Sequence, residues 1–333
     1  MAKKVITFGE VMMRLSPPGY SKFSQTTTLE MVYGGGEANV AISLAYLGMK
    51  AAHVTRFPDN ALGKAAAQFL RQHWLSTEHV IYGGDMIGKY FLEKGAVHRS
   101  SEVIYEREGS SFSLIEPPMV NWEKVLKDAD WFHWTGITPA ISNGAAMCCL
   151  DAIKTANKMG IPVSGDINSR DNMWKYGKTM EEVMPELVRN CDIVITSSRG
   201  IREMFGLGDE GDKFKKASKN LMEEFPKIKK VVGKTRKSLS ASHQRIQGKM
   251  WNGTDYIKTE MLDITPVIDR VGTGDAFAAG LIYGLLHYED QKALDFASAA
   301  CALKHTVPGD VNMVSLDNVL SLMDGDTSGS IKR

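Results

Sequence analysis

The stretch DRVGTGDAF, residues 269–277, places two acids, an arginine and two glycines at the start of the apolar run AFAAGLIYGLL. Strand-like residues 256–264 precede it, so Gly272, Thr273 and Gly274 are expected at the N-terminus of a helix. Free backbone N–H groups and the positive end of the helix dipole attract anions there, and glycines let an oxyanion come close. The turn therefore predicts an anion site.

Asp275 puts a negative charge where that anion should bind. One interpretation is an ordinary N-terminal cap, a role that aspartate commonly takes. The preceding Gly-x-Gly favours a second interpretation, because a cap needs no close approach of a ligand to the backbone. Phosphoryl transfer to an alcohol requires a base that accepts the hydroxyl proton while amides hold the developing charge. We therefore expect Asp275 to be a catalytic base.

Short β-branched runs alternate with segments of helical periodicity along most of the chain. Strands are expected at residues 4–9, 51–57, 129–136, 161–167, 191–198 and 228–234, and helices at 37–48, 60–74, 143–160 and 179–190. This alternation predicts an α/β fold with a mainly parallel central sheet and helices on both faces. Ligands of such sheets bind at the carboxyl ends of the strands.

Two stretches, residues 10–33 and 79–108, interrupt this alternation with strand-like patterns and Gly and Pro turns. They are separated in sequence and flank the three glycines at 34–36, so we expect them to form one small antiparallel sheet. Such a sheet is more typical of a hinged lid than of an independent domain. We therefore expect a single domain over residues 1–333 that carries a small β-sheet lid.

Composition excludes several other classes of protein. The 333 residues are 43% hydrophobic and 24% charged, as in a globular protein. The formal net charge of +1 does not indicate the basic surface that binds nucleic acid. No apolar run is long enough to span a bilayer, and the chain starts with a strand rather than a leader peptide. The four cysteines form no CxxC pair and no zinc-site spacing. We expect a cytoplasmic protein without nucleic-acid or membrane partners.

The segments YGGGEANVAISLAYLG (33–48) and DRVGTGDAFAAGL (269–281) together form a specific pair. They resemble the N-terminal and C-terminal signatures of the ribokinase-like, or PfkB, carbohydrate kinases. Within that family, the segments KYFLEKG, VIYEREGSS and DINSRDNMW resemble those of 2-keto-3-deoxygluconate kinases. The resemblance implies a ribokinase-like fold and phosphorylation of the 6-hydroxyl of a six-carbon sugar acid, with ATP and Mg²⁺.

The resemblance also implies roles for individual residues. It makes Asp275 the catalytic base, and the anion hole for the transferred phosphate is then formed by Gly272, Thr273 and Gly274. The positions that would contact the sugar are Gly34, Gly35 and Asn39. The positions that would hold the acid end and the chain of the substrate are Tyr90, Tyr105, Arg107 and Arg170. The implied nucleotide-binding positions are Ser197, Lys234, Thr235, Arg236, Gly272, Gly274, Lys304 and His305. In the alternative interpretation, the two tyrosines belong to the core of the lid and the two arginines form surface ion pairs.

Two departures from the family pattern concern the metal and the substrate. The family's Asn-x-x-Glu motif, which helps to organise Mg²⁺, is replaced here by Ser197 and Gly200, so the sequence does not identify the metal ligands. Many neutral-sugar kinases carry an aspartate near the end of the first strand, where this chain has Arg14. A cation agrees with an acidic substrate, although we expect Arg14 to lie on the lid surface. Dependence on a monovalent cation is left open.

Other functions stay open at this point. A fructokinase or a ribokinase would have the same fold, and a non-catalytic sensor could bind a sugar acid without turnover. The intact Gly-x-Gly-Asp argues against the sensor, because binding alone does not need Asp275. The expected partners are a sugar-acid substrate and ATP. The resemblance also implies a homo-oligomer that forms through pairing of two lids.

Overall fold

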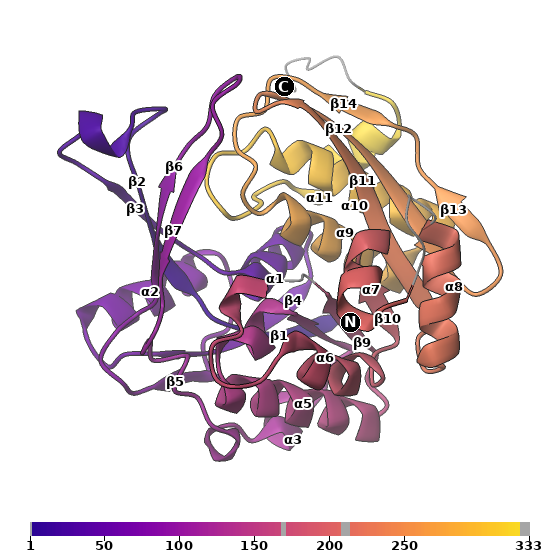
Figure 1. Ribbon diagram of the computed structural model, residues 1–333, viewed down its shortest axis with the longest axis horizontal. Helices are drawn as coiled ribbons and strands as arrows, with labels where there is room; N and C mark the ends of the chain where they lie inside the picture. The colour runs from indigo at the N-terminus through magenta and orange to yellow at the C-terminus, as the bar shows by residue number, and fades with distance from the viewer. Residues whose placement is uncertain (1, 168–170, 208–213, 327–333) are drawn as a thin grey trace.

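The computed structural model describes residues 2–167, 171–207 and 214–326. A central sheet runs through the molecule, helices cover it, and a smaller sheet projects from one side (Figure 1). The predicted α/β class, with a mainly parallel central sheet and a separate small sheet, is confirmed. No helix among the described residues is long and apolar enough to cross a membrane.

The central sheet has ten strands within the described residues, in the order β13-β12-β11-β10-β9-β8-β1-β4-β5, with β14 paired to β12. From β5 to β11 neighbouring strands are parallel, whereas β12, β13 and β14 join in antiparallel pairs. The six strands predicted from the alternation all belong to this sheet. Its strands are β1 (Lys4–Phe8), β4 (Lys50–Phe57), β5 (Val80–Tyr82), β8 (Trp131–Thr135), β9 (Val163–Asp166), β10 (Ile193–Ile195), β11 (Lys230–Ser240), β12 (His243–Trp251), β13 (Tyr256–Lys258) and β14 (Leu262–Ile264).

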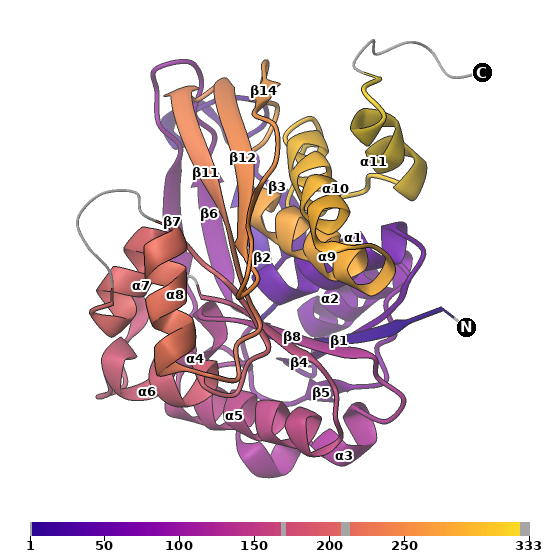
Figure 2. The ribbon, with the colours of Figure 1, turned by 90° about the vertical axis from the view of Figure 1, so that its right-hand side faces the viewer.

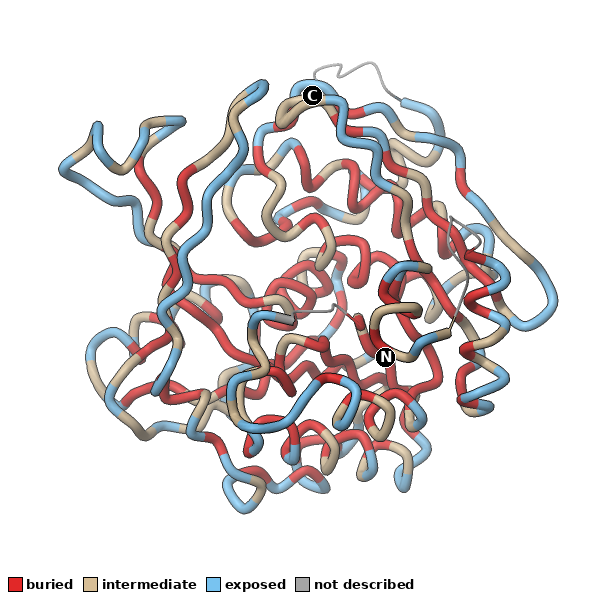
Figure 3. The backbone as a smooth tube through the Cα atoms, in the orientation of Figure 1, coloured by how far each residue is buried: buried red, intermediate tan, exposed pale blue. Residues whose placement is uncertain are grey.

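Both faces of the central sheet are buried, because successive strand residues point to opposite sides. Val5 and Ile193 pack into one core, whereas their neighbours Ile6 and Val194 pack into the other. Figure 2 shows helices on the two faces, and Figure 3 shows the buried backbone between them. The first core holds α1 (Gly36–Tyr46), α2 (Ala61–Gln72), α9 (Thr273–His287), α10 (Asp290–Lys304) and α11 (Leu316–Met323). The second holds α3 (Trp122–Val125), α4 (Ile137–Ile141), α5 (Asn143–Lys158), α6 (Met180–Val188), α7 (Ser198–Phe205) and α8 (Phe214–Glu224).

Local signals in the sequence explain where these helices begin. The Asn60 side chain accepts hydrogen bonds from the Leu62 and Gly63 N–H groups before α2, and Ser142 accepts one from Ala145 before α5. Such caps satisfy N–H groups that have no partner within the helix. The four helices predicted from periodicity are α1, α2, α5 and α6, and short 3₁₀ turns occur at Phe23–Gln25, Pro117–Met119 and Asp171–Met173.

We keep the name lid for the smaller sheet, which is made of β2 (Met12–Ser16), β3 (Glu30–Gly34), β6 (Lys89–Glu93) and β7 (Glu102–Glu106). Its order is β3-β2-β6-β7, and each of the two predicted stretches supplies two of its strands. The prediction of a purely antiparallel sheet is wrong, because β2 and β6 run parallel after the chain has passed through the central sheet between them. The second stretch also supplies β5, which pairs with β4 of the central sheet instead of the lid.

Candidate active site

A cavity of about 620 Å³, the central cavity, lies between the lid and the carboxyl ends of the central strands. Its lining residues come from the lid, α1, β11 and the start of α9, so the fold joins positions that are far apart in sequence. Among them are most of the predicted site residues: Gly34, Gly35, Asn39, Tyr90, Tyr105, Ser197, Lys234, Arg236, Gly272, Thr273, Gly274 and Asp275.

A wider groove of about 1560 Å³ adjoins the central cavity and shares Gly35, Tyr105, Ser197 and Arg236 with it. Arg107 lines this outer groove. Arg170, which the sequence assigns to the acid end of the substrate, lies outside the described residues.

The start of α9 has the geometry of an anion hole. Gly272 is the N-cap, and its φ of 76° lies in the left-handed region that glycine adopts without strain. A Cβ at Gly272 would collide with the backbone oxygen of Asp310, whereas a Cβ at Gly274 would meet only the Lys234 Nζ, at 3.7 Å. The first turn therefore presents open backbone N–H groups to the cavity. Because Gly272 is the cap, the interpretation of Asp275 as an ordinary N-cap is wrong.

Asp275 lies in this first turn and faces the central cavity. The Asn39 Nδ2 donates a 2.7 Å hydrogen bond to the Asp275 Oδ2. Burial raises the pKa of Asp275 to about 7. The Asn39 hydrogen bond and Lys234 act to lower this pKa, whereas the charges of Asp166 and Glu37 act to raise it. A carboxylate with a pKa near neutrality can take a proton from a hydroxyl group and later release it.

Glu37, which the sequence analysis missed, is buried in the first turn of α1. Its Oε1 accepts hydrogen bonds from the hydroxyls of Thr135, at 2.8 Å, and Thr138, at 2.6 Å. Burial raises the Glu37 pKa, and these hydroxyls oppose the increase. The contacts fix the start of α1 against the end of β8 and so hold Asn39 beside Asp275. An acidic residue after three glycines was the only signal in the sequence, and it does not distinguish burial from exposure.

Asp310 is a second residue that the sequence analysis missed. Its carboxylate lines the central cavity and accepts hydrogen bonds from the Tyr90 hydroxyl and from the Arg14 Nη1, the latter at 2.5 Å. Burial raises the Asp310 pKa, and the charge of Arg14 opposes the increase. The Arg14 Nη2 also lies 3.4 Å from Asp269, and the arginine side chain is only 2% exposed. The expectation that Arg14 lies on the lid surface is therefore wrong, because two carboxylates of the main body compensate its buried charge.

The acid-binding residues predicted in the lid differ in their surroundings. The Arg107 Nε donates a 2.9 Å hydrogen bond to Glu10 Oε2, and its Nη2 lies 2.6 Å from the same oxygen. Glu10 is buried and also accepts a hydrogen bond from Ser110. Arg107 is thus in an ion pair, as the alternative interpretation proposed, although this pair is largely buried. Tyr90 belongs to the lid core, whereas Tyr105 is 57% exposed and its ring centre lies 5.6 Å from the Arg107 guanidinium.

The predicted nucleotide-binding residues on β11 alternate in direction. Lys234 and Arg236 line the central cavity, whereas Thr235 between them points to the other side and does not line it. The Lys234 Nζ lies 3.4 Å from the Thr273 backbone oxygen, next to the anion hole. Ser197 lines the cavity and is the N-cap of α7, where its hydroxyl accepts a helix N–H at 3.0 Å.

Lys304 and His305 do not line the central cavity. The Lys304 Nζ donates hydrogen bonds to the backbone oxygens of Val307 and Gly309, at 2.9 Å each. His305 donates to a backbone oxygen of its own helix, and burial lowers its pKa to about 4. The contact of these two side chains with the nucleotide therefore stays a prediction. Lys304 holds the loop that leads to Asp310.

Among the described residues, no group of three or more His, Cys, Asp and Glu side chains could hold a metal ion by itself. The central cavity does contain carboxylates, including those of Asp166 and Asp275. Mg²⁺ is commonly held by one or two carboxylates together with phosphate oxygens and water. The side chains present therefore fit a magnesium ion that is shared with a phosphate-bearing substrate.

The fold and the site together define a class of protein. The chain belongs to the pfkB family of carbohydrate kinases, whose family model matches residues 2–316. It is therefore a sugar kinase, as the paired signatures predict.

Three relatives narrow the comparison. The 2-dehydro-3-deoxygalactonokinase of Haloferax volcanii is 30% identical over 331 residues, which cover 99% of each chain. The 2-dehydro-3-deoxygluconokinase of Bacillus subtilis is 27% identical over 94% of this chain and 92% of that protein. The crystal structure of a 2-dehydro-3-deoxygluconokinase from Thermotoga maritima is 38% identical and superposes with a TM-score of 0.93, covering 98% of this chain and 99% of the other. The chain is thus similar to kinases of keto-deoxy sugar acids over nearly its full length.

Proposed function

We propose that this protein transfers the γ-phosphoryl group of ATP to the 6-hydroxyl of 2-keto-3-deoxygluconate, also called 2-dehydro-3-deoxygluconate. One observation carries the proposal: Asp275, with a pKa of about 7, lies in the same cavity as the open first turn of α9. The names of the relatives from Bacillus subtilis and Thermotoga maritima support the choice of sugar acid.

The mechanism follows from the side chains at the phosphate end of the cavity. Asp275 accepts the hydroxyl proton as the sugar oxygen bonds to the γ-phosphorus, and the bond from that phosphorus to the bridging oxygen breaks to leave ADP. Backbone N–H groups around Gly274 stabilise the charge on the phosphoryl oxygens, and Lys234 adds a positive charge beside them. Asn39 orients the carboxylate by donating to one oxygen, which leaves the other for the hydroxyl. A bound Mg²⁺ would be held by the phosphate oxygens together with a cavity carboxylate such as that of Asp166, and would neutralise part of the phosphate charge.

For the nucleotide we propose the members of the predicted set that face the cavity: Ser197, Lys234, Arg236, Gly272 and Gly274. For the sugar chain we propose Gly34, Gly35, Asn39 and Tyr90, and we add Asp310, whose carboxylate can accept hydrogen bonds from sugar hydroxyls.

For the acid end we retain Tyr105, Arg107 and Arg170 as proposed contacts. Glu10 already neutralises much of the Arg107 charge, so a sugar carboxylate gains less from this arginine than from an unpaired one. The guanidinium still carries N–H donors that are not directed at Glu10, and its edge reaches the outer groove. Recognition of the acid by Arg107 is therefore expected to be moderate in strength.

A coupled assay for ADP release tests the proposal directly. Wild-type protein is supplied with ATP, Mg²⁺ and, in turn, 2-keto-3-deoxygluconate, its galactonate-derived epimer, fructose and ribose. We expect the highest kcat/KM for the gluconate-derived acid. Preference for fructose or ribose would identify another sugar kinase of this fold, and sugar binding without ADP release would identify a sensor.

We also propose that the lid pairs with the lid of a second copy. Every residue of β7 is exposed, and the lid carries the exposed apolar side chains Met31, Val103 and Ile104. Exposed apolar surface of this kind commonly marks an interaction site. Light scattering after size-exclusion chromatography should give at least a dimer, and Ile104→Lys should shift it toward the monomer; a monomeric wild type would contradict this proposal.

A further inference from the structure

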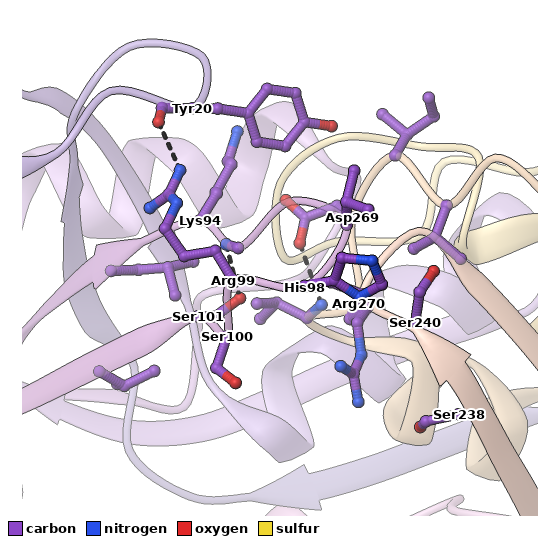
Figure 4. A pocket seen from close by; sticks show the side chains of 18 of the residues that line it. Tyr20, Lys94, His98, Arg99, Ser100, Ser101, Ser238, Ser240, Asp269 and Arg270 are labelled. Carbon is purple, nitrogen blue, oxygen red and sulfur yellow. Dashed lines mark hydrogen bonds between the residues drawn. The ribbon is translucent and has the colours of Figure 1, made fainter.

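A second cavity, of about 590 Å³, lies between the tip of the lid and the hairpin that joins β11 to β12. Figure 4 shows its side chains, which come from the lid, from this hairpin and from the segment before the anion hole. The lid tip contacts the hairpin directly, because the Ala241 N–H donates a 2.8 Å hydrogen bond to the Val97 backbone oxygen. We call it the lid-tip cavity; the mechanism above makes no use of its interior.

Positive charge dominates the lining of the lid-tip cavity. Its cationic side chains are Lys94, Arg99, Arg236 and Arg270, and Asp269 is the only carboxylate among its described lining residues. Asp269 is already engaged, since it accepts hydrogen bonds from the Val271 and Gly309 N–H groups and faces Arg14.

Three of these four cations have no anionic partner among the described residues. Arg99 pairs with Glu93, at 2.7 Å, and donates to a backbone oxygen. Within the part of the chain that the structure describes, Lys94, Arg236 and Arg270 form no ion pair and no side-chain hydrogen bond. Unpaired cations around one concave surface favour the binding of an anion.

Arg236 and Arg270 also act on each other. Burial lowers the Arg270 pKa, and the nearby charge of Arg236 lowers it further. Two guanidinium groups held close together without a counter-ion repel each other, and a phosphate group placed between them would relieve that repulsion. Both arginines line the central cavity as well as the lid-tip cavity, so the two cavities share this part of their walls.

The remaining lining suits an organic molecule better than a bare ion. Leu92, Val97 and Val267 contribute apolar surface, and Ser100 and Ser238, labelled in Figure 4, contribute hydroxyl groups. A volume of this size, with apolar walls and a few charged groups, is typical of small-molecule sites. Lys94 and Arg99 belong to the lid, whereas Arg236 and Arg270 belong to the main body. A molecule with an anionic group at each end would therefore contact both parts.

We propose that the lid-tip cavity is a regulatory site for a small sugar-acid phosphate, with one anionic end held by Arg236 and Arg270 and the other by the lid cations. Such a ligand competes with the nucleotide phosphates for Arg236, which the proposed function assigns to the nucleotide and which lines both cavities. It therefore inhibits the kinase by raising the KM for ATP. The binding part of this inference does not depend on the proposed sugar substrate, and the kinetic part rests on the proposed use of ATP.

The test uses 6-phosphogluconate as the probe, with gluconate and inorganic phosphate as comparison ligands. Isothermal titration calorimetry on the full chain measures binding to wild type, to Lys94→Gln and to the matched control Lys89→Gln. Lys89 begins strand β6, which ends at Glu93 just before Lys94; it pairs with Glu106 and does not line the cavity. We expect saturable binding of 6-phosphogluconate that Lys94→Gln weakens about tenfold, the size of one lost charged hydrogen bond, and that the control leaves unchanged.

Kinetics with whichever sugar the enzyme phosphorylates provides the second readout. Lys94→Gln should keep the basal kcat and KM values and lose most of the inhibition by 6-phosphogluconate. Equal binding to all three proteins would place the ligand elsewhere and overturn the proposal, as would the absence of binding. If gluconate binds as tightly as 6-phosphogluconate, the site does not recognise a phosphate group. If inorganic phosphate binds as tightly, the site does not recognise the sugar-acid part of the ligand. Failure to phosphorylate the keto-deoxy acid would affect the proposed function alone.

Discussion

The two ends of the central cavity are built in different ways. At the end proposed for the phosphate, called the phosphate end, one contiguous turn, residues 269–275, supplies backbone N–H groups and a carboxylate. At the end proposed for the sugar, called the sugar end, side chains of the lid meet Asp310, which lies on a loop far away in sequence. A backbone site keeps its chemistry when surrounding side chains change, whereas a site made of side chains changes with each substitution. The comparison explains how one fold can keep phosphoryl transfer constant and vary the sugar.

Replacement of the base at the phosphate end should have the largest effect. Asp275→Asn keeps the size of the side chain but cannot accept the hydroxyl proton, so kcat should fall by about 10² to 10⁴. Steady-state kinetics measures this, with ATP binding and thermal unfolding as controls that should stay near wild type. Turnover within a few-fold of wild type would remove Asp275 from the mechanism.

The sugar end depends on a buried ion pair, and its loss should mainly reduce stability. Arg14→Met leaves Asp310 and Asp269 buried without their cation, which should cost about 3–5 kcal/mol of the free energy of unfolding. Urea denaturation measures the loss, and Arg71→Met, in an exposed part of α2, is the matched control. If the two variants unfold alike, the buried pair does not stabilise the lid against the body.

Two glycines of one turn should separate folding from catalysis. Gly272→Ala forces a Cβ toward the Asp310 backbone at a left-handed φ and should cost about 1–3 kcal/mol of stability. Gly274→Ala has space for its Cβ, so it should fold normally while the added methyl group hinders the phosphate and lowers kcat about 10²-fold. Thermal unfolding and kinetics measured on both variants check this. Equal losses of stability would show that the space at Gly274 is not available.

The phosphate end could be read from the sequence for a physical reason. Its elements are local: Gly272 and Gly274 set the backbone, and Asp275 follows in the same turn, so the spacing of three residues carries the geometry. The alternating sheet and helices were predictable for a similar reason, because periodicity within each segment reports which face is buried.

The sugar end could not be read in this way. Glu37, Glu10 and Asp310 act through partners that lie between 97 and 296 positions away in the chain, and nothing local marks them as buried. Arg14 was misplaced for the same reason, since its carboxylate partners follow it by 255 and 296 positions. The parallel pairing of β2 with β6 also depends on how the chain crosses the central sheet, which strand patterns do not reveal.

The pH dependence of the reaction sharpens the role of Asp275. Its pKa, raised to about 7, means that the carboxyl group is protonated and inactive below that pH, so kcat/KM should rise with pH until it levels off above 7. Asn39→Ala removes the hydrogen bond that lowers this pKa, so the midpoint should move to higher pH. A pH profile of kcat/KM on wild type and Asn39→Ala checks both statements. A midpoint that does not move would mean that another group controls the profile.

The smallest effects are expected at the acid end, where Glu10 already occupies Arg107. Arg107→Leu should raise the KM for the sugar acid about tenfold, because one charged hydrogen bond is lost, and should change the weak activity on fructose little.

This variant also leaves Glu10 buried without its cation, so a second variant is needed, in which Glu10 itself is changed. Glu10→Gln keeps the shape of the pair but frees the positive charge of Arg107, and it should lower the KM for the acid about two- to fivefold. Both KM values are measured against acid and neutral sugars. Opposite shifts for the acid, with none for fructose, would locate the substrate carboxylate beside Arg107; a rise in KM for both variants and both sugars would mean that the ion pair only supports the lid, and the carboxylate would have to be sought at another cation of the outer groove.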